Sequence, residues 1–219
     1  MSSFSLKLFA CFFMLIDHIG FCLYPNLIIL RMLGRIAFPI FAFQVSIGYQ
    51  HTKNKINYIS RMLIFAIISQ VPSLFFEKLA GISEFGTNIG FTFFISLLCL
   101  YVIDLFKEKK YFSILLLLIP LIISSVLLKT DYSFYGVLTV ILFYLINHKK
   151  YITLFISFSY LTLIYTLINS YPLYQMLAVL SLAFIFLFNG KKGKNAKYLF
   201  YIFYPLHMII LGIVKYMFL

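Results

Sequence analysis

The sequence predicts an all-α integral membrane protein, a polytopic helix bundle with about nine transmembrane helices and a cytoplasmic N-terminus. Hydrophobic residues make up 63% of its 219 residues and charged residues 11%, whereas soluble domains average about 45–50% apolar and about 25% charged residues. The hydrophobic residues form successive runs, most of them near the roughly 20 residues that cross a bilayer as a helix. Because the loops are short and no repeat is present, we expect one transmembrane domain over residues 1–219.

The first four hydrophobic runs cover residues 4–24, 27–50, 57–76 and 89–106. The first contains Asp17 and His18 and has no small-x-small cleavage site after it, so we expect a retained helix rather than a signal peptide. The second run follows "PN", the third follows the polar loop "HTKNKIN", and the fourth follows "EKLAGISEFGTN". Asn88 closes that last loop and is a suitable N-cap for the fourth helix.

The remaining hydrophobic runs cover residues 111–129, 133–147, 150–168, 171–188 and 198–218. The first of them follows "KEKK", and the others follow "TDYS", "HKK", "NSYP" and "GKKGKNAK". The run 133–147 is shorter than a bilayer-spanning helix, so it could be tilted, re-entrant or broken. The helix count could therefore also be eight or ten.

Lysine distribution tests this division of the chain. The loops after the second, fourth, sixth and eighth predicted helices are rich in lysine, whereas the alternate loops are nearly free of it. Positively charged loops face the cytoplasm, so these loops and the N-terminus with Lys7 are predicted to be cytoplasmic, in a bacterial cytoplasmic membrane. Most of the net charge of +12 is thereby explained by topology, and nothing else in the sequence supports a nucleic-acid partner. The lysines of these loops are Lys53, Lys55, Lys107, Lys109, Lys110, Lys149, Lys150, Lys191, Lys192, Lys194 and Lys197.

Ionisable side chains inside the predicted membrane helices are the candidates for chemistry. They are Asp17, His18, Arg31, Arg35 and His207. A charge at the bilayer centre costs about 2.5–3.5 kcal/mol on insertion scales, so such residues pair with one another or have a function. At a rise of about 1.5 Å per residue, His18 lies roughly 16 Å deeper than Lys7, and the two arginines reach a similar depth from the outer side. Together with His207, these residues could share one cavity in the outer half of the membrane.

Structural roles compete with functional ones at these positions. Asp17 could simply neutralise an arginine so that both insert, and His207 could donate to a backbone carbonyl and do nothing else. Adjacent helical residues point about 100° apart, which makes Asp17 a better partner for an arginine than for His18. An unpaired buried imidazole destabilises a protein, and histidine is the side chain best suited to proton transfer near neutral pH. His18 is therefore the strongest candidate for a catalytic group.

Other polar segments have strong structural explanations. In "TDYSFYG" (130–136), Asp131 could cap the next helix or face the same cavity, and Asp131 and Tyr135 are our candidate substrate-binding residues. In "NGKKGKNAK" (189–197), a helix C-cap followed by a cytoplasmic loop explains the sequence, although a phosphate site containing Lys191 and Lys192 would look similar. Arg61 lies about one turn inside the third predicted helix, near the cytoplasmic face.

Several classes of site are not supported by the sequence. The three cysteines (Cys11, Cys22 and Cys99) lie inside apolar runs with no CxxC spacing, and the four histidines are scattered. This pattern gives neither a disulfide framework nor a metal site, so no metal is expected. The chain contains no Walker A, GxGxxG, HExxH or GxSxG motif.

Six motifs, in order along nearly the whole chain, resemble the TraX family of membrane proteins. They are "MLIDHIG" (14–20), "RMLGRIAFPIFAF" (31–43), "GYQHTKN" (48–54), "RMLIFAIISQVP" (61–72), "DYSFYG" (131–136) and "FYPLHMIIL" (203–211). The family is named for a protein implicated in acetylating the N-terminus of conjugative pilin. It is grouped with the wider transmembrane acyltransferases, including the acyltransferase-3 enzymes, which pass an acetyl group from cytosolic acetyl-CoA to an acceptor across the membrane.

The resemblance implies a site as well as an activity. A basic residue and a histidine separated by ten residues on the first helix recur in acyltransferase-3 proteins, and Lys7 and His18 match this pattern, with lysine in place of the commoner arginine. The resemblance implies acetyl-CoA as the acyl donor, held by Lys7, Arg61, Lys191 and Lys192. It implies a peptide N-terminus or a surface glycan as the acceptor.

Acetyl transfer needs a base for the acceptor's proton and cationic groups for the charge that develops on the carbonyl oxygen. His18 would be that base or would transiently carry the acetyl group. Arg31 or Arg35 would stabilise the oxyanion, and His207 would form a second polar wall. Two other classes compete. A small transporter could use the same residues as a proton relay, and a non-catalytic assembly protein could use them only for helix packing. The sequence gives no oligomeric state.

Overall fold

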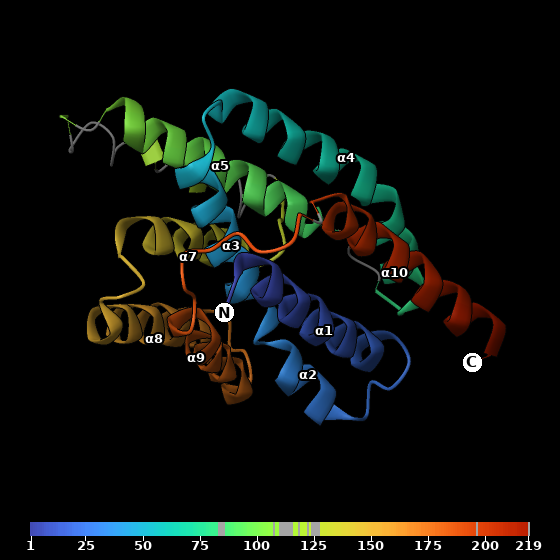
Figure 1. Cartoon of the computed structure of the whole chain (residues 1–219). Coiled ribbons are helices and arrows are strands. Elements are labelled where there is room, and N and C mark those ends of the chain that lie inside the picture. Colours follow the sequence, from blue (N-terminus) through green and yellow to red (C-terminus); the bar gives the residue numbers. More distant parts are fainter. Residues whose placement is uncertain are drawn as a thin grey trace.

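The protein is described by a computed structural model for residues 1–82, 86–106, 108–109, 116–117, 119–121, 123, 128–195 and 197–218. These residues form a helical bundle. Among them, one isolated β-bridge joins Thr87 and Thr130. Figure 1 shows the arrangement, with α1 lying between α2 and α10. The elements are α1 Ser3–Cys22, α2 Ile28–Gly34, α3 Ala37–His51, α4 Lys55–Leu79, α5 Ile89–Leu105, α7 Ser133–Leu145, α8 Tyr151–Ile168, the 3-10 helix η2 Leu173–Leu180, α9 Ser181–Phe186 and α10 Lys197–Phe218.

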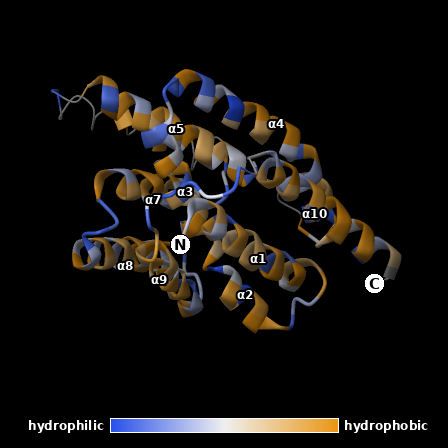
Figure 2. Ribbon diagram, in the orientation of Figure 1, coloured by the Kyte–Doolittle hydropathy of each residue, from blue (hydrophilic) through white to orange (hydrophobic). Residues whose placement is uncertain are grey.

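The predicted membrane bundle is confirmed. Within the described ranges, five helical spans are long and apolar enough to cross a membrane, at Ser3–Cys22, Ile28–His51, Lys55–Leu79, Tyr151–Ile168 and Tyr198–Met217. Shorter apolar helices occupy Ile89–Leu105, Ser133–Leu145 and Leu173–Phe186. Figure 2 shows hydrophobic residues over most of the helices, with hydrophilic residues in connections such as that between α7 and α8. The predicted helix 111–129 lies largely outside the described residues.

The second predicted helix, 27–50, is confirmed as one span with a local change of hydrogen bonding in its middle. At Arg35 and Ile36 the backbone N–H groups donate to Met32 and Leu33, three residues back, at 3.3 Å. Pro39 explains this tightening, because it has no N–H to donate to the Arg35 carbonyl. The chain therefore continues in almost the same direction from α2 into α3.

The eighth predicted helix, 171–188, differs more from the expectation of a regular α-helix. Its first half is the 3-10 helix η2, and only Ser181–Phe186 is α-helical. Within η2, Gln175 and Ala178 are buried, three residues apart, which is the spacing that places side chains on one face of a 3-10 helix. This geometry turns Gln175 toward α2.

Several buried hydroxyl groups in the bundle are satisfied within their own helices, whereas those of Ser46, Ser69 and Ser181 have no hydrogen-bond partner among the described residues. Ser96 donates to the carbonyl of Thr92 at 2.7 Å, and Thr139 and Thr162 each bond in the same way to the carbonyl four residues earlier, at 2.8 Å. Such bonds allow small polar residues inside a membrane, where water is not available. The predicted N-cap is also confirmed, since the Asn88 side chain accepts a hydrogen bond from Gly90 N at 2.8 Å.

The N-terminus and the lysine-rich connections that the structure describes after α3, α7 and α9 lie at one end of the bundle. The N–H groups of Ser3 and Phe4, which have no partner inside α1, donate to the carbonyls of Lys191 and Lys192 at 2.8 and 3.1 Å. At the same end, Gln50 near the C-terminus of α3 bonds the Tyr144 carbonyl near the C-terminus of α7 at 3.4 Å. We call this the basic end. The predicted topology likewise places these loops and the N-terminus on the same side of the membrane.

Candidate active site

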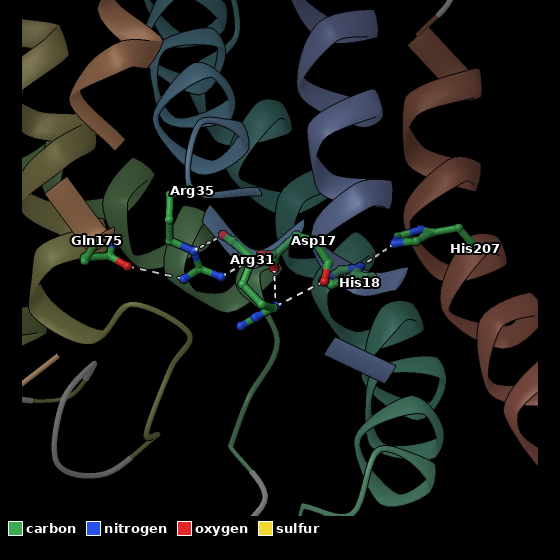
Figure 3. A network of polar contacts seen from close by, with 6 residues as sticks. All are labelled: Asp17, His18, Arg31, Arg35, Gln175 and His207. Atoms are coloured by element: carbon green, nitrogen blue, oxygen red, sulfur yellow. Dashed lines mark hydrogen bonds and ion pairs between the residues drawn. The ribbon is translucent and has the colours of Figure 1, made fainter. Parts of the chain in front are cut away.

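Asp17 is the centre of an ion cluster between α1 and α2 (Figure 3). Its Oδ2 accepts from Arg31 Nη1 at 2.6 Å and its Oδ1 from Arg35 Nη2 at 2.7 Å. Arg35 also donates through Nε to the Arg31 carbonyl at 3.2 Å and through Nη1 to Gln175 of η2 at 3.3 Å. One carboxylate thus orients two guanidinium groups that share a helix face, and the cluster keeps a net charge of +1.

Glycine allows α2 to approach α1 this closely. A Cβ atom at Gly34 would lie 2.1 Å from Asp17 Oδ1, and one at Gly20 would lie 2.6 Å from the Leu30 Cβ. Neither neighbour is the free end of a flexible chain, so any side chain at Gly34 would displace the carboxylate. Gly34 is therefore part of the site.

His18 contacts His207 of α10 on the side away from the arginines (Figure 3). Its Nδ1 lies 2.6 Å from His207 Nε2, and the two ring planes are within 6° of each other. The other ring nitrogen of His207, Nδ1, lies 2.7 Å from the Phe203 carbonyl oxygen. Asp17 and His18 thus point to different partners, as the 100° between them predicts.

A first cavity of about 380 Å³ runs from the basic end toward this polar group. Lys7, Arg61, Lys192 and Lys194 lie at its basic end. Phenylalanine side chains such as Phe41 line its middle, and Asp17, His18, Asp131 and Tyr132 line its deep end. This shape suits a long ligand with an anionic head and an uncharged arm.

A second cavity of about 530 Å³ approaches from the opposite end of the bundle. Its lining is more polar than that of the first cavity. Its lining includes Arg31, Arg35, Glu77, Lys129, Tyr165 and Tyr171, together with Asp17, His18, Asp131 and Tyr132.

Among the described residues, four line both cavities: Asp17, His18, Asp131 and Tyr132. We call these four residues the partition. Tyr132 has a left-handed backbone with φ of 60°, and its ring stacks on Phe38 at 4.0 Å between centroids. Such a backbone is uncommon and strained for tyrosine, and strained residues of this kind cluster at functional sites.

Asp131 does not cap α7, although capping was one prediction from the sequence. Tyr132 occupies the N-cap position without a side-chain bond, and the Asp131 carboxyl lines both cavities instead. Burial raises the pKa of Asp131 to about 7, and the negative charge of Glu77 adds to this shift. The backbone of this loop is anchored because Thr92 Oγ1 donates to the Asp131 carbonyl at 2.6 Å.

The structure brings most of the predicted site residues together but places three of them differently. His207 is buried behind His18 and is not among the described residues that line either cavity. Tyr135 lies in the core, fully buried, with its hydroxyl 3.2 Å from Thr162 Oγ1. Lys191 is exposed beside the first cavity, and only its neighbour Lys192 lines that cavity.

Sequence reasoning missed Gly34, Glu77, Tyr132 and Gln175. Gly34 had a signal, since it lies inside the motif "RMLGRIAFPIFAF" between the two arginines. Tyr132 adjoins Asp131, but it is uncharged at neutral pH and so was not among the ionisable candidates. Glu77 and Gln175 come from segments far apart in the sequence, and only the fold places them near the arginines. No group of three or more metal-ligating side chains occurs within the described part of the chain.

The fold and the site together define a helical integral membrane protein with a charged, histidine-containing group between two cavities. A family model described as TraX protein matches residues 2–215. The chain belongs to the TraX family, which confirms the resemblance noted from the motifs.

Two curated relatives extend this comparison. The chain is 26% identical to the probable fimbrial assembly protein FimC, serogroup H1, of Dichelobacter nodosus, over 96% of this chain and 94% of that protein. It is 30% identical to the uncharacterized protein RP591 of Rickettsia prowazekii, over 66% of this chain and 56% of that protein. No solved structure matches the chain.

Proposed function

We propose that the protein is a membrane-embedded acetyltransferase that moves an acetyl group from cytosolic acetyl-CoA to an acceptor on the outer side of a bacterial cytoplasmic membrane. The observation that carries this proposal is that His18 lines both cavities. A donor from one end and an acceptor from the other would meet at this imidazole. The association of the TraX family with pilin acetylation, and the fimbrial assembly name of a relative, favour an acceptor exported for pilus formation.

The first cavity has the features that an acetyl-CoA site needs. Lys7, Arg61 and Lys192 at its basic end would bind the CoA phosphates. The Ser3 hydroxyl donates to the side-chain amide oxygen of Gln44. The amide nitrogen of Gln44 is buried without a partner among the described residues, so it is available to an amide carbonyl of the pantetheine arm. His18 lies about 16 Å beyond Lys7 along α1, within reach of a thioester at the end of that arm.

The polar cluster suits the chemistry of acetyl transfer. His18 would take the proton of the acceptor as its nitrogen or oxygen attacks the thioester, or would carry the acetyl group between the two cavities. Arg31 and Arg35 line the second cavity beside it and would stabilise the negative charge on the carbonyl oxygen. Because Asp17 fixes both guanidinium groups, they need no reorganisation during the reaction.

The second cavity favours an amine acceptor over a glycan hydroxyl. Glu77 and Asp131 offer carboxyl groups that would attract a protonated amine and take its extra proton, so that the neutral amine can attack the thioester. Tyr165 and Tyr171 offer an aromatic wall for the adjoining apolar side chain. A peptide N-terminus has this combination. A hydroxyl acceptor of a surface glycan would not use the carboxyl charges.

Calorimetry of acetyl-CoA binding to the purified protein in nanodiscs tests the proposal. We expect saturable binding that weakens at least about tenfold in Lys7→Ala, since one charged contact contributes about 1.5–3 kcal/mol and 1.4 kcal/mol is a factor of about ten. Binding should be unchanged in His18→Ala. Lys150→Ala is the matched control, because this lysine of the basic end is exposed and is not among the described residues that line the first cavity. In the same preparations, His18→Ala should abolish transfer of labelled acetyl groups to a peptide amine.

The competing classes give different results in this experiment. A transporter with the same two cavities would show no binding of acetyl-CoA in a well-folded sample. A non-catalytic assembly protein would lose expression or thermal stability in His18→Ala. Either result would contradict the acetyltransferase proposal.

A further inference from the structure

The two histidines at the partition are linked to a backbone carbonyl, and this link fixes the positions of their protons. His207 Nδ1 lies 2.7 Å from the Phe203 oxygen, and His207 Nε2 lies 2.6 Å from His18 Nδ1. The rings are nearly coplanar, at 6°, with centroids 4.9 Å apart, so the lone pair of one nitrogen points along the N–H bond of the other (Figure 3).

A carbonyl oxygen can only accept a hydrogen bond, so the Nδ1 atom of His207 must carry a proton. In a neutral imidazole the other nitrogen then has no proton and can only accept. His207 Nε2 therefore accepts, and His18 Nδ1 must donate to it. His18 Nε2 is left without a proton.

We propose that His207 is a positioning residue that holds His18 in the tautomer with a basic Nε2. The assignment rests on the two hydrogen bonds, and its catalytic consequence rests on the proposed function. Because Nδ1 is bonded to His207 and His18 lines both cavities, Nε2 is the nitrogen left for a ligand. Histidine tautomers are generally set by the hydrogen bond of the opposite nitrogen, and here a second histidine supplies that bond.

The link also allows the positive charge that forms during acetyl transfer to move from His18 to the imidazole of His207. As the bond from the acceptor nitrogen to the acetyl carbon forms, its proton moves to His18 Nε2. The proton on His18 Nδ1 can shift to His207 Nε2, and the Phe203 oxygen then stabilises the imidazolium through Nδ1–H. When the carbon–sulfur bond breaks, the shift reverses and His18 Nε2 gives the proton to the departing thiolate, which completes the balance.

Packing alone does not explain histidine at position 207. The ring is buried against Phe203, with centroids 4.8 Å apart, and a phenylalanine would fill this apolar space. A purely structural residue would therefore tolerate phenylalanine, whereas a positioning residue would not. Glutamine separates the two parts of the role, since its carbonyl oxygen is as many bonds from Cβ as His207 Nε2. It can accept from His18 but cannot take a proton.

Nuclear magnetic resonance of ¹⁵N-histidine-labelled protein in nanodiscs tests the tautomer directly, because protonated and unprotonated ring nitrogens have separate chemical shifts. In the wild type we expect His18 to show a protonated Nδ1 and an unprotonated Nε2. His207→Gln should keep that pattern, and His207→Phe should shift His18 toward the tautomer with Nε2–H. The control is His51→Gln, which changes an exposed histidine and should leave the His18 signals unchanged.

Single-turnover acetyl transfer then tests the consequence. We expect His207→Phe to be about 100-fold slower than the wild type, the loss typical of a misplaced general base. His207→Gln should be at least about tenfold faster than His207→Phe, and His51→Gln should match the wild type. A protonated Nε2 on His18 in the wild type, or an unchanged tautomer and rate in His207→Phe, would overturn the proposal. The expected tautomers without any acetyl transfer in the wild type would support the assignment and refute the proposed function instead.

Discussion

Replacing Asp17 by asparagine should destabilise the protein strongly, because one carboxylate compensates two buried cations. Its oxygens lie 2.6 and 2.7 Å from Arg31 and Arg35. At an effective dielectric constant of about 20, each attraction is worth roughly 4 kcal/mol for charge centres about 4 Å apart. Removing one partner of a buried ion pair costs about 3–5 kcal/mol in practice.

The expected loss lies near the lower end of that range. The Arg31 side chain is 24% exposed and can regain water from the second cavity, whereas the Arg35 side chain is only 12% exposed. A loss of about 3 kcal/mol in a chain of this size lowers the melting temperature by about 6–12 °C. Thermal unfolding in detergent, followed by size-exclusion chromatography, measures the shift.

Asp104→Asn is the matched control, since its carboxylate accepts from the hydroxyl groups of Tyr49 and Tyr144 rather than from guanidinium groups. Loss of such contacts should cost about 1–2 kcal/mol. If Asp17→Asn melts within about 2 °C of the wild type, or no lower than Asp104→Asn, the pairing of Asp17 with the two arginines does not stabilise the fold.

Three further substitutions test other parts of the structure. Gly34→Ala should lower expression and melting temperature as much as Asp17→Asn, because its Cβ would lie 2.1 Å from the Asp17 carboxylate; a near-normal melting curve would contradict this. Asn88→Ala should cost about 2–3 kcal/mol, since it removes a cap and two buried bonds, against about 1 kcal/mol for the exposed cap Asn54→Ala. The raised pKa of Asp131, about 7 against 3.8, means that the folded state binds more protons than the unfolded state between these values. Stability should therefore fall as pH rises from about 4 to 7 and then become constant, and Asp131→Asn should reduce this slope in pH-dependent melting curves.

The sequence predicts the pairing of Asp17 with the arginines because depth alone constrains it. Counting residues from each membrane face places both groups in the same layer, and the cost of a lone buried charge makes a pair necessary. The rotation of about 100° per residue along a helix also correctly predicts that Asp17 and His18 contact different partners. The hydropathy pattern likewise predicts the membrane helices, since every backbone polar group in a bilayer must bond within its own helix.

The sequence could not predict which helices lie behind His18. The contact with His207 joins residues 189 positions apart, and it depends on how α10 packs against α1, which composition does not encode. The 3-10 geometry of η2, which turns Gln175 toward Arg35, could not be predicted either, because it also depends on how the helices pack. Tyr135 was misleading because an aromatic residue beside a polar motif can face either the core or a cavity.

The partition separates two cavities that approach it from opposite ends of the bundle, and this arrangement changes where the membrane potential falls. Where water enters both cavities, the two aqueous phases approach each other on either side of Asp17, His18, Asp131 and Tyr132. Most of the membrane potential then falls across these few side chains rather than across the full hydrocarbon thickness of about 30 Å. A proton that crosses from the second cavity to the first through His18 would experience nearly the whole voltage, about 2.3 kcal/mol for each 100 mV.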